Sequence, residues 1–479
     1  MKIEENKKKK SVIILGGGLA GLSAGWILQK NGYSVKLIEK CPDLGGLAIT
    51  REKEGYKFDL GPHNIHSSKS HIIRFLSEKL PDFYEHCPFN QIYKNSKFIR
   101  YPLQGIHVIL ALPKWKIVPA ILSFVFARIR LYFRYFVVED SFEQWIKNRF
   151  GSLLFEEYFG SYAKKVWGIP SEKIDKYVAE KRVPTTSLLD MLKAVFTKKQ
   201  NVDHPEFAHR NYYFKKGVHS ITAFFKKDLE QYGAEIKREI ELINVKTKEN
   251  HITSIIYKDK TGNTHIENCD FLLSTIPLNQ FIPLFENADP SVLKNTNAID
   301  YCSTILIFLK IKKTNVFTSP LVYFSDPSVR FSRVSDVGMY SESMVPQGKC
   351  LLCVEFPCSK GDEIWNDSAE NLSKYVLEYF VDCKFIEMID FEGSFHEKIE
   401  HSYPRFKVGF KQNIEHIFDY LSQFKNVLSF GRQGGFSYLN VDGVIDQGFN
   451  ASISVIMSET IGEPCMDWFA ANGGKPFQL

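Results

Sequence analysis

Residues 11–21 read SVIILGGGLAG, a short apolar run that passes directly into a glycine-rich turn. The apolar run predicts a buried strand, and the Ala- and Leu-rich residues after it predict a helix. Gly16 permits a tight turn, Gly18 lets the backbone approach a pyrophosphate, and Gly21 lets helix and strand pack closely. Since a helix N-terminus also leaves backbone N–H groups for a diphosphate, the stretch predicts a dinucleotide site.

An acidic residue completes this motif at the end of the next predicted strand. The apolar residues 35–38 are followed by Glu39, which lies 18 residues after Gly21. A carboxylate at the tip of the second strand can accept hydrogen bonds from an adenosine ribose. The strand, the turn, the helix and the acid therefore all fall where dinucleotide binding requires them.

Two further glycine-rich patches favour FAD over NAD. The pair Gly45-Gly46 follows Glu39 closely, and residues 431–435 read GRQGG shortly before a final predicted helix over 448–461. Each patch allows another close backbone approach to the cofactor. A flavin that is held throughout turnover is wrapped by several such loops, so the sequence predicts FAD.

Composition and patterning bound the architecture. A chain of 479 residues with 44% hydrophobic and 14% aromatic residues can form two or three domains. We expect an α/β protein with a discontinuous Rossmann-type FAD-binding domain, an inserted helical domain and an antiparallel β-sheet substrate domain. The FAD-binding domain takes 11–85, 211–289 and 416–479, the helical domain 86–210 and the antiparallel domain 290–415.

Charge and cysteine usage argue against several classes of protein. The net charge of +6 is mild and comes partly from a lysine run at 7–10, so it does not indicate nucleic acid. Nine irregularly spaced cysteines and no secretory segment before residue 11 predict a reducing, cytoplasmic location. Cys350, Cys353 and Cys358 fall in a predicted strand, where they are expected to be small core residues, and no metal site is predicted.

The segment 103–138 is unusually apolar and leaves three alternatives open. Its longest uncharged run, 117–127, has 11 residues, and a bilayer-spanning helix needs about 20. The segment could form the core of the helical domain or the seam of a homodimer. Its basic flanks and its aromatic residues would also suit peripheral contact with the inner face of the membrane.

Several further motifs resemble those of UDP-galactopyranose mutases and, more broadly, of the amine oxidase and protoporphyrinogen oxidase group of FAD proteins. Residues 61–66, GPHNIH, are similar to the mutase stretch that passes the flavin ring. Residues 162–168, YAKKVWG, look like its uridine-binding helix, and residues 182–184, RVP, fall where it has a mobile-loop arginine. Gly431-Arg432, Tyr438 and Asp442 match its C-terminal flavin and diphosphate motif.

The motifs and the resemblance together imply three sets of site residues. For FAD we expect Gly16, Gly18, Leu19, Ala20, Gly21, Glu39, Lys40, Gly45, Gly46, Leu47, Gly61, Pro62, His63, Ile240, Gly431, Arg432, Asn440, Val441 and Asp442. For the substrate we expect Tyr162, Trp167, Arg182 and Tyr438, and as catalytic residues Arg182, His63 and Arg432.

Each of these residues also has a plainer interpretation. Tyr162 and Trp167 could be core aromatics at a helix end, His63 could be a polar turn residue, and Arg182 could be a solvated charge.

The sequence also departs from the mutase pattern. A second diphosphate-binding arginine would fall at Cys302, a tyrosine at Phe331, and one acid of a C-terminal pair is Asn440. Losing a charge-assisted hydrogen bond removes roughly 1.5–3 kcal/mol. Ring contraction of UDP-galactose therefore does not follow from the resemblance, and the substrate could be another nucleotide sugar.

Three functions remain as hypotheses. The resemblance implies redox-neutral pyranose–furanose isomerisation of a nucleotide sugar through flavin N5, or a related conversion, in cell-surface glycan biosynthesis. The alternative is an FAD oxidase or desaturase that oxidises its substrate. A flavin-binding structural protein without activity is the third.

Overall fold

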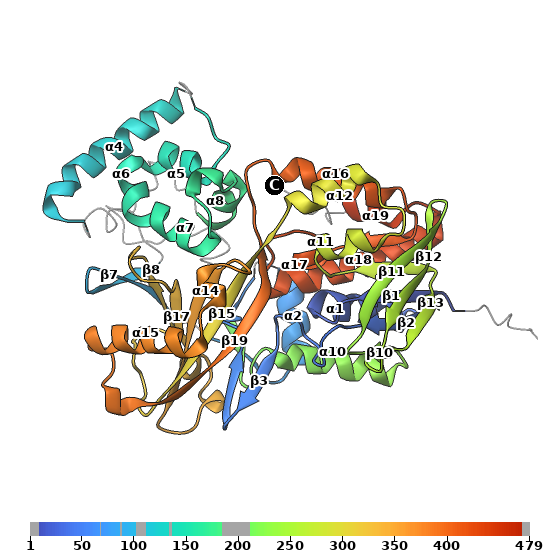
Figure 1. The fold of residues 1–479 in the computed structure, drawn as a ribbon, viewed down its shortest axis with the longest axis horizontal. Helices are drawn as coiled ribbons and strands as arrows, with labels where there is room; N and C mark the ends of the chain where they lie inside the picture. The colour runs from blue at the N-terminus through green and yellow to red at the C-terminus, as the bar shows by residue number, and fades with distance from the viewer. Residues whose placement is uncertain are drawn as a thin grey trace, which may run out of the picture.

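The computed structural model describes residues 9–67, 69–86, 89–101, 112–133, 137–183 and 211–471. Within them, a parallel and an antiparallel sheet lie side by side, and a group of helices covers one end of the antiparallel sheet (Figure 1). The predicted mixed α/β architecture with a Rossmann-type domain is confirmed. The predicted end of the helical domain at residue 210 lies outside the described residues.

The parallel sheet has strands from three distant parts of the chain. Its five strands lie in the order β10 (Glu235–Lys237), β2 (Ser34–Ile38), β1 (Ser11–Leu15), β14 (Phe271–Ser274) and β20 (Val427–Ser429). All four pairings are parallel. Because both faces of the sheet are covered, β1, β14 and β20 are almost entirely buried.

The helices on this sheet pack unusually closely. α1 (Leu19–Lys30) lies against α10 (His219–Gln231) and against α18 (Val441–Ile461). Gly448 of α18 faces α1, where a Cβ would collide with the Ser23 hydroxyl and lie 2.8 Å from the carbonyl oxygen of Ala20. The last long helix is thereby fixed against the first, with its N-terminus near the glycine turn.

The second sheet has seven strands, in the order β19 (Phe391–Pro404), β15 (Tyr301–Ile311), β18 (Cys350–Cys358), β17 (Arg333–Asp336), β16 (Leu321–Phe324), β7 (Asn90–Lys94) and β8 (Lys97–Tyr101). All pairs are antiparallel except β16–β7. α15 (Ala369–Asp382) covers one face through Val376 and Phe380. Cys350, Cys353 and Cys358 are buried in β18.

The start of the helical part differs from the predicted boundary at residue 86. β7 and β8 form a hairpin that belongs to the antiparallel sheet. Asn95 and Ser96 form its two-residue turn with positive φ angles of 50° and 58°, which is the geometry that tight hairpins prefer. This hairpin removes residues 90–101 from the helical region.

The helical part packs around α4 (Lys114–Tyr132) and α5 (Phe142–Phe150). It continues through α6 (Ser152–Leu154), the π-helix η1 (Phe155–Gly160), α7 (Ser161–Trp167), η2 (Ser171–Lys173) and α8 (Lys176–Arg182). A capping box at Ser141 and Gln144 starts α5, and Gly168 ends α7 in the left-handed conformation. These caps fix where α5 begins and where α7 ends.

The remaining elements connect or cover the two sheets. The strands are β3 (Thr50–Lys53), β4 (Tyr56–Asp59), β5 (Ile65–His66), β6 (Phe83–Glu85), β9 (Asn211–Phe214), β11 (Glu241–Lys248), β12 (His251–Lys258) and β13 (Thr264–Asn268). The helices are α2 (Ser70–Lys79), α11 (Leu278–Phe281), η4 (Ile282–Leu284), α12 (Pro290–Ala298), α13 (Val337–Tyr340), η5 (Glu342–Met344), α14 (Glu363–Asn366), η6 (Met388–Asp390), α16 (Phe410–Ser422), α17 (Gly431–Gly434) and α19 (Cys465–Phe469).

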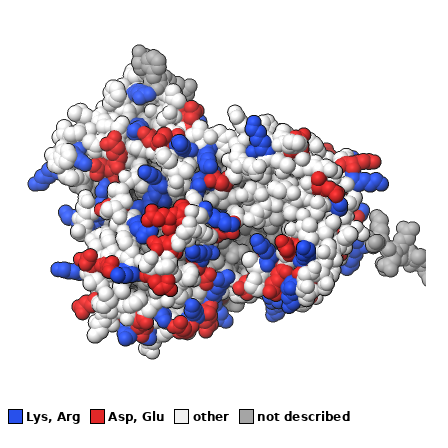
Figure 2. Space-filling view, in the orientation of Figure 1, with Lys and Arg blue, Asp and Glu red and all other residues white. Residues whose placement is uncertain are grey.

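Lys and Arg side chains are interspersed with Asp and Glu over the face of the molecule in Figure 2. No helix in the described part of the chain is long and apolar enough to cross a membrane.

We predict that Gly448→Ala destabilises the fold, although Ala normally stabilises a helix interior relative to Gly. The added methyl group has no space against α1, so the free energy of unfolding should fall by roughly 1–3 kcal/mol in a urea titration. Ile453→Ala, at a 41% exposed position of the same helix, is the control and should change it by less than about 0.5 kcal/mol. A Gly448→Ala protein as stable as the wild type would contradict the close packing.

Candidate functional site

The glycine turn after β1 has the backbone geometry that the sequence predicts. Gly16 has a φ of 101°, and its N–H donates to the carbonyl oxygen of Ile38 at 2.8 Å. The N–H of Gly45 donates to the carbonyl oxygen of Gly17 at 2.8 Å. The first two glycine patches therefore lie in direct contact, although a strand and a helix separate them in the sequence.

Glu39 lies at the edge of this turn. Its carboxylate accepts hydrogen bonds from the N–H groups of Gly17 at 2.6 Å and Cys41 at 2.8 Å. The N–H of Ile240 donates to the carbonyl oxygen of Glu39 at 3.1 Å, while Lys40 is exposed beside it. Glu39, Lys40 and Ile240 thus form one edge of the crevice above the turn.

Gly18 faces open space rather than protein. It precedes the first residue of α1, and a Cβ built on it would lie 4.0 Å from its nearest neighbours, Gly45 and Gly46. Gly21, in contrast, has no space for a Cβ because it packs on Gly16. The two glycines therefore have different roles, one in an accessible backbone surface and one in helix–strand packing.

The third patch closes over the first. Gly431 has a φ of 83°, and a Cβ on it would lie 2.9 Å from Cβ of Ala20 in α1. Its N–H donates to Oε1 of Gln447 at 2.9 Å. Asn440, Val441 and Asp442 follow at the N-terminus of α18, which points its positive dipole end toward the same crevice. These groups fit FAD. The two helix N-termini and the accessible Gly18 can donate hydrogen bonds to its diphosphate, and the Glu39 carboxylate can accept hydrogen bonds from its ribose.

A cavity of about 320 Å³ continues from this crevice between the helical part and the antiparallel sheet. Among the predicted residues, those that line it are Leu47, Gly61, Pro62, His63, Tyr162, Trp167, Arg182, Arg432, Tyr438, Asn440 and Val441. The predicted residues that do not line it are those of the glycine crevice: Gly16, Gly18, Leu19, Ala20, Gly21, Glu39, Lys40, Gly45, Gly46, Ile240, Gly431 and Asp442.

Two arginines and two tyrosines in the cavity form a continuous stack. The guanidinium of Arg182 lies 4.6 Å from the ring centre of Tyr438, and that of Arg432 lies 5.0 Å from the ring centre of Tyr403. The two rings stack with centres 5.7 Å apart and an angle of 16°. Arg182 also donates a hydrogen bond to the hydroxyl of Tyr438. The order Arg182, Tyr438, Tyr403, Arg432 places a cation at each end of an aromatic pair.

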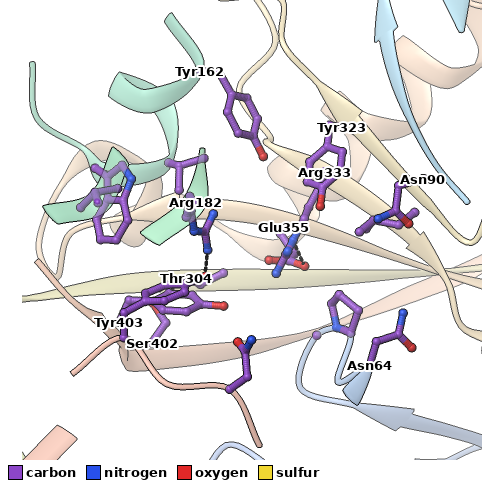
Figure 3. A pocket seen from close by; sticks show the side chains of 18 of the residues that line it. Asn64, Asn90, Tyr162, Arg182, Thr304, Tyr323, Arg333, Glu355, Ser402 and Tyr403 are labelled. Carbon is purple, nitrogen blue, oxygen red and sulfur yellow. Dashed lines mark hydrogen bonds and ion pairs between the residues drawn. The ribbon is translucent and has the colours of Figure 1, made fainter. Parts of the chain in front are cut away.

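Arg333 and Glu355 form an ion pair on the opposite wall (Figure 3). Nε of Arg333 donates to Oε1 of Glu355 at 2.6 Å. Burial lowers the pKa of Arg333, but Glu355 and the nearby tyrosines outweigh this effect and raise the pKa well above its usual value. Among the described lining residues, three arginines face a single carboxylate, so the cavity is suited to an anion.

The arginines also act on Tyr403. Burial raises the pKa of this phenol, but Arg333, Arg432 and Arg182 outweigh burial and hold the pKa below its ordinary value. Tyr162, whose hydroxyl points into the same space in Figure 3, has a raised pKa because burial dominates. The arginines of both walls therefore act on Tyr403 more strongly than burial does.

Several polar atoms in the cavity wall have no hydrogen-bond partner among the described residues. They are Asn64 Oδ1, His66 Nδ1, Asn90 Oδ1, Arg182 Nε, Ser325 Oγ and the hydroxyl of Tyr340. Buried polar groups are normally paired. Their number in one cavity indicates a polar ligand with several hydrogen-bonding groups.

His63 is neutral in this environment. Burial, and then Arg432, lower its pKa to about 4, and Nδ1 lies 2.9 Å from the carbonyl oxygen of Gly61. Since a carbonyl only accepts, Nδ1 carries the proton and Nε2 is left unprotonated. His63 is thus held by a backbone contact rather than being a free turn residue.

The structure supports both interpretations of Trp167. Its ring lines the cavity, yet the side chain is 4% exposed and packs edge-on against Phe406. Arg182 is the last residue of α8, and residues 184–210 lie outside the described part of the chain.

Of the three departures from the mutase pattern, Asn440 lines the cavity, whereas Cys302 and Phe331 lie outside its wall. Cys302 is buried against Arg405, whose Nε lies 3.5 Å from its sulfur, and Phe331 is fully buried under α15. The residues that sequence reasoning missed are Arg333, Glu355, Tyr323 and Tyr403. They come from strands β16 to β19 of the antiparallel sheet. The sequence feature that could have identified them is a charged residue within an apolar run, such as Glu355 between Val354 and Phe356.

Comparison with known proteins gives matches over the whole fold but only short matches in sequence. Residues 14–78 match the family described as NAD(P)-binding Rossmann-like domain. A 1-hydroxycarotenoid 3,4-desaturase of Flavobacterium sp. (strain P99-3) is 40% identical over 87 residues, which are 18% of this chain and 17% of the desaturase. This chain therefore matches less than a fifth of that relative's length.

Solved structures match over nearly the full chain. Reduced UDP-galactopyranose mutase superposes with a TM-score of 0.82 at 19% identity, covering 98% of both chains. A putative protoporphyrinogen oxidase from Exiguobacterium sp. 255-15 gives a TM-score of 0.72 at 15% identity, covering 95% of this chain and 99% of the other. This chain therefore has the fold of these two proteins.

We predict that His63 and Asp59 give the folded state opposing pH dependences. Burial raises the pKa of Asp59 to about 6, so the folded state binds more protons than the unfolded state between about pH 4 and 6, and this group makes stability fall as pH rises. The pKa of His63 is lowered from 6.5 to about 4, so this group makes stability rise with pH over nearly the same window.

The test is urea unfolding at several pH values between 4 and 7. His63→Asn leaves the Asp59 effect, so the variant should lose stability relative to the wild type by on the order of 3 kcal/mol as pH rises from about 4 to 7. Asp59→Asn should give the opposite slope. If the free energy of unfolding depended on pH in the same way in all three proteins, the pKa shifts of His63 and Asp59 would be contradicted.

Proposed function

We propose that this chain is an FAD-dependent enzyme that acts on a nucleotide-activated sugar, by pyranose–furanose isomerisation or a related conversion, in cell-surface glycan biosynthesis. The observation that carries the proposal is the charge of the cavity: three arginines around one carboxylate, beside a glycine-rich dinucleotide crevice. A nucleoside diphosphate sugar carries two negative charges, an aromatic base and many hydroxyl groups. These match the arginines, the aromatic residues and the unpaired polar atoms, respectively.

The residues of this chain would divide the ligand between them. Arg182 and Arg432 would bind the diphosphate, and Tyr162 with Trp167 would hold the base. The unpartnered amides of Asn64 and Asn90 would accept hydrogen bonds from sugar hydroxyls. Three arginines around a buried diphosphate would also stabilise the charge that develops when the bond to the sugar breaks.

FAD would be held by the Gly16–Gly18 turn, Gly45-Gly46, Glu39 and the N-terminus of α18. When bound, it supplies a nucleophilic N5 in the reduced form and a two-electron acceptor in the oxidised form. Neutral His63, held by the Gly61 carbonyl, would present an unprotonated Nε2 at the end of the cavity nearest this crevice. The chain's own part in the reaction is to orient the sugar and to exclude water.

The second candidate is a net oxidation, as in the desaturase that is similar to this chain over 87 residues. The short sequence match to a carotenoid desaturase favours it. The cavity argues against a polyene substrate, because buried arginines and unpaired amides would lose their hydration without gaining partners.

We predict that Gly18→Ala lowers FAD affinity by at least about tenfold, because the methyl group projects into the open crevice where the pyrophosphate lies. The apoprotein should keep its free energy of unfolding within about 1 kcal/mol, since a Cβ at Gly18 meets no protein atom closer than 4.0 Å. Fluorescence titration of apoprotein with FAD, together with urea unfolding, checks both parts. If wild-type apoprotein could not be reconstituted with FAD, the proposal that FAD is the cofactor would be refuted.

We predict that the FAD-loaded protein binds UDP and that Arg182→Gln weakens this binding by roughly 10- to 150-fold, the value of a charged hydrogen bond. Lys164→Gln, which removes a charge from an exposed position of α7, is the matched control and should leave the affinity unchanged. Isothermal titration calorimetry gives both values. Equal affinities for the two variants would exclude a diphosphate at Arg182.

Activity assays on the FAD-loaded protein distinguish the isomerisation from the net oxidation. A nucleotide-sugar isomerase should convert UDP-galactose only after the flavin has been reduced with dithionite, with no net oxidation. Bleaching of the oxidised flavin by a substrate without oxygen would instead select the oxidase or desaturase.

A further inference from the structure

Helix α4 forms the outermost edge of the helical part (Figure 1), and its outward side is almost entirely apolar. The exposed large apolar side chains on and just after this helix are Trp115, Val118, Ile121, Leu122, Val125, Phe126, Ile129, Tyr132 and Phe133. Several are strongly exposed, with 73% for Trp115, 64% for Leu122 and 69% for Phe126. Single exposed apolar residues are ordinary, but a contiguous group of this size marks an interaction surface.

The opposite side of the helix is fixed to the protein. Ala120, Phe124 and Ala127 are buried and pack on Leu154 and Tyr158. At 100° per residue, these three positions share one face of the helix, while Trp115, Leu122, Phe126 and Ile129 share the other. The exposed side is therefore a stable feature of the fold rather than a core face that has lost its cover.

The charged residues of the helix itself all have one sign. Residues 112–138 contain no Asp or Glu, whereas Lys114, Lys116, Arg128 and Arg130 lie on α4. On the helix, Lys116 and Arg130 border the apolar arc on one side and Arg128 on the other. Lys116 reaches inward to Glu157, and burial and nearby Arg149 lower the pKa of Arg128. An apolar arc between basic borders is the pattern of a helix that lies in a membrane interface.

We propose that α4 docks this protein on the surface of an anionic lipid bilayer, with its apolar arc among the acyl chains and its basic residues at the headgroups. A second copy of the chain fits this surface less well, because a two-fold pairing through α4 would bring the basic borders of both copies together. No described helix can cross a bilayer, so the contact is peripheral. This proposal does not rest on the reaction proposed above.

Docking would also bring the cavity close to the membrane. Tyr158, which packs on the inner side of α4, and Phe159 both line the cavity. One layer of side chains thus separates the lipid-facing helix from the substrate site.

The test is flotation of the FAD-loaded full chain with vesicles. We expect the wild type to float with vesicles of mixed phosphatidylglycerol and phosphatidylcholine and much less with phosphatidylcholine alone. Leu122→Glu combined with Phe126→Glu should reduce the bound fraction by at least about tenfold. Ile266→Glu combined with Ile389→Glu, at positions 69% and 78% exposed elsewhere, should bind like the wild type. Lys114→Gln with Arg128→Gln should weaken binding only to the anionic vesicles.

Two further measurements make the outcome unambiguous. Thermal unfolding of the Leu122/Phe126 variant should match the wild type, and brominated lipids should quench a fluorescence component that Trp115→Phe removes. The proposal is overturned if the wild type does not float, or if the Leu122/Phe126 variant floats equally well. It is also overturned if that variant converts a wild-type dimer to a monomer while vesicles bind neither protein, which would assign the surface to a second copy.

Discussion

The stack of Arg182, Tyr438, Tyr403 and Arg432 is the interaction on which the rest of the site depends. Its members come from α8, the end of β19 and the segment around α17, which are far apart in the sequence. Like-charged guanidinium groups repel one another in a buried space, and the electron-rich ring faces between them reduce that repulsion. Arg333 adds a further positive charge, which Glu355 partly neutralises. The protein thereby maintains a buried positive potential that only an anionic ligand would satisfy.

The interleaved topology makes this convergence possible. The parallel sheet takes strands from the beginning, the middle and the end of the chain, so its carboxyl edge gathers three loops that the sequence separates widely. The glycines at that edge serve two purposes, since Gly21 and Gly448 let α1 pack against β1 and α18, while Gly18 keeps the crevice accessible. The antiparallel sheet then places its polar residues beside this crevice.

Much of the Rossmann part could be predicted from sequence because its signals are local. A strand, a glycine turn, a helix and Glu39 lie within 29 residues, from 11 to 39, and each follows from backbone sterics and hydrogen bonding. The lining residues at Tyr162, Arg182, Arg432 and Tyr438 were found through resemblance, and the structure places them in one cavity. Their roles stay predictions until a ligand is bound.

The remaining features depend on tertiary contacts that no local pattern contains. Arg333 and Glu355 pair across β17 and β18, and this register is decided by the whole sheet. The loss of an arginine at Cys302 looked like a defect in the site, yet Arg333 brings a positive charge to the cavity from another strand. The β7–β8 hairpin was assigned to a helical region because its pairing partner, β16, lies more than 200 residues away in the sequence.

The most direct test of this account is a crystal structure of the FAD-loaded protein with UDP. The account predicts a flavin diphosphate over Gly18 at the N-terminus of α1 and a UDP diphosphate in contact with the arginines of the cavity. A structure with the glycine crevice filled by side chains, or with UDP bound away from the arginine–tyrosine stack, would contradict it.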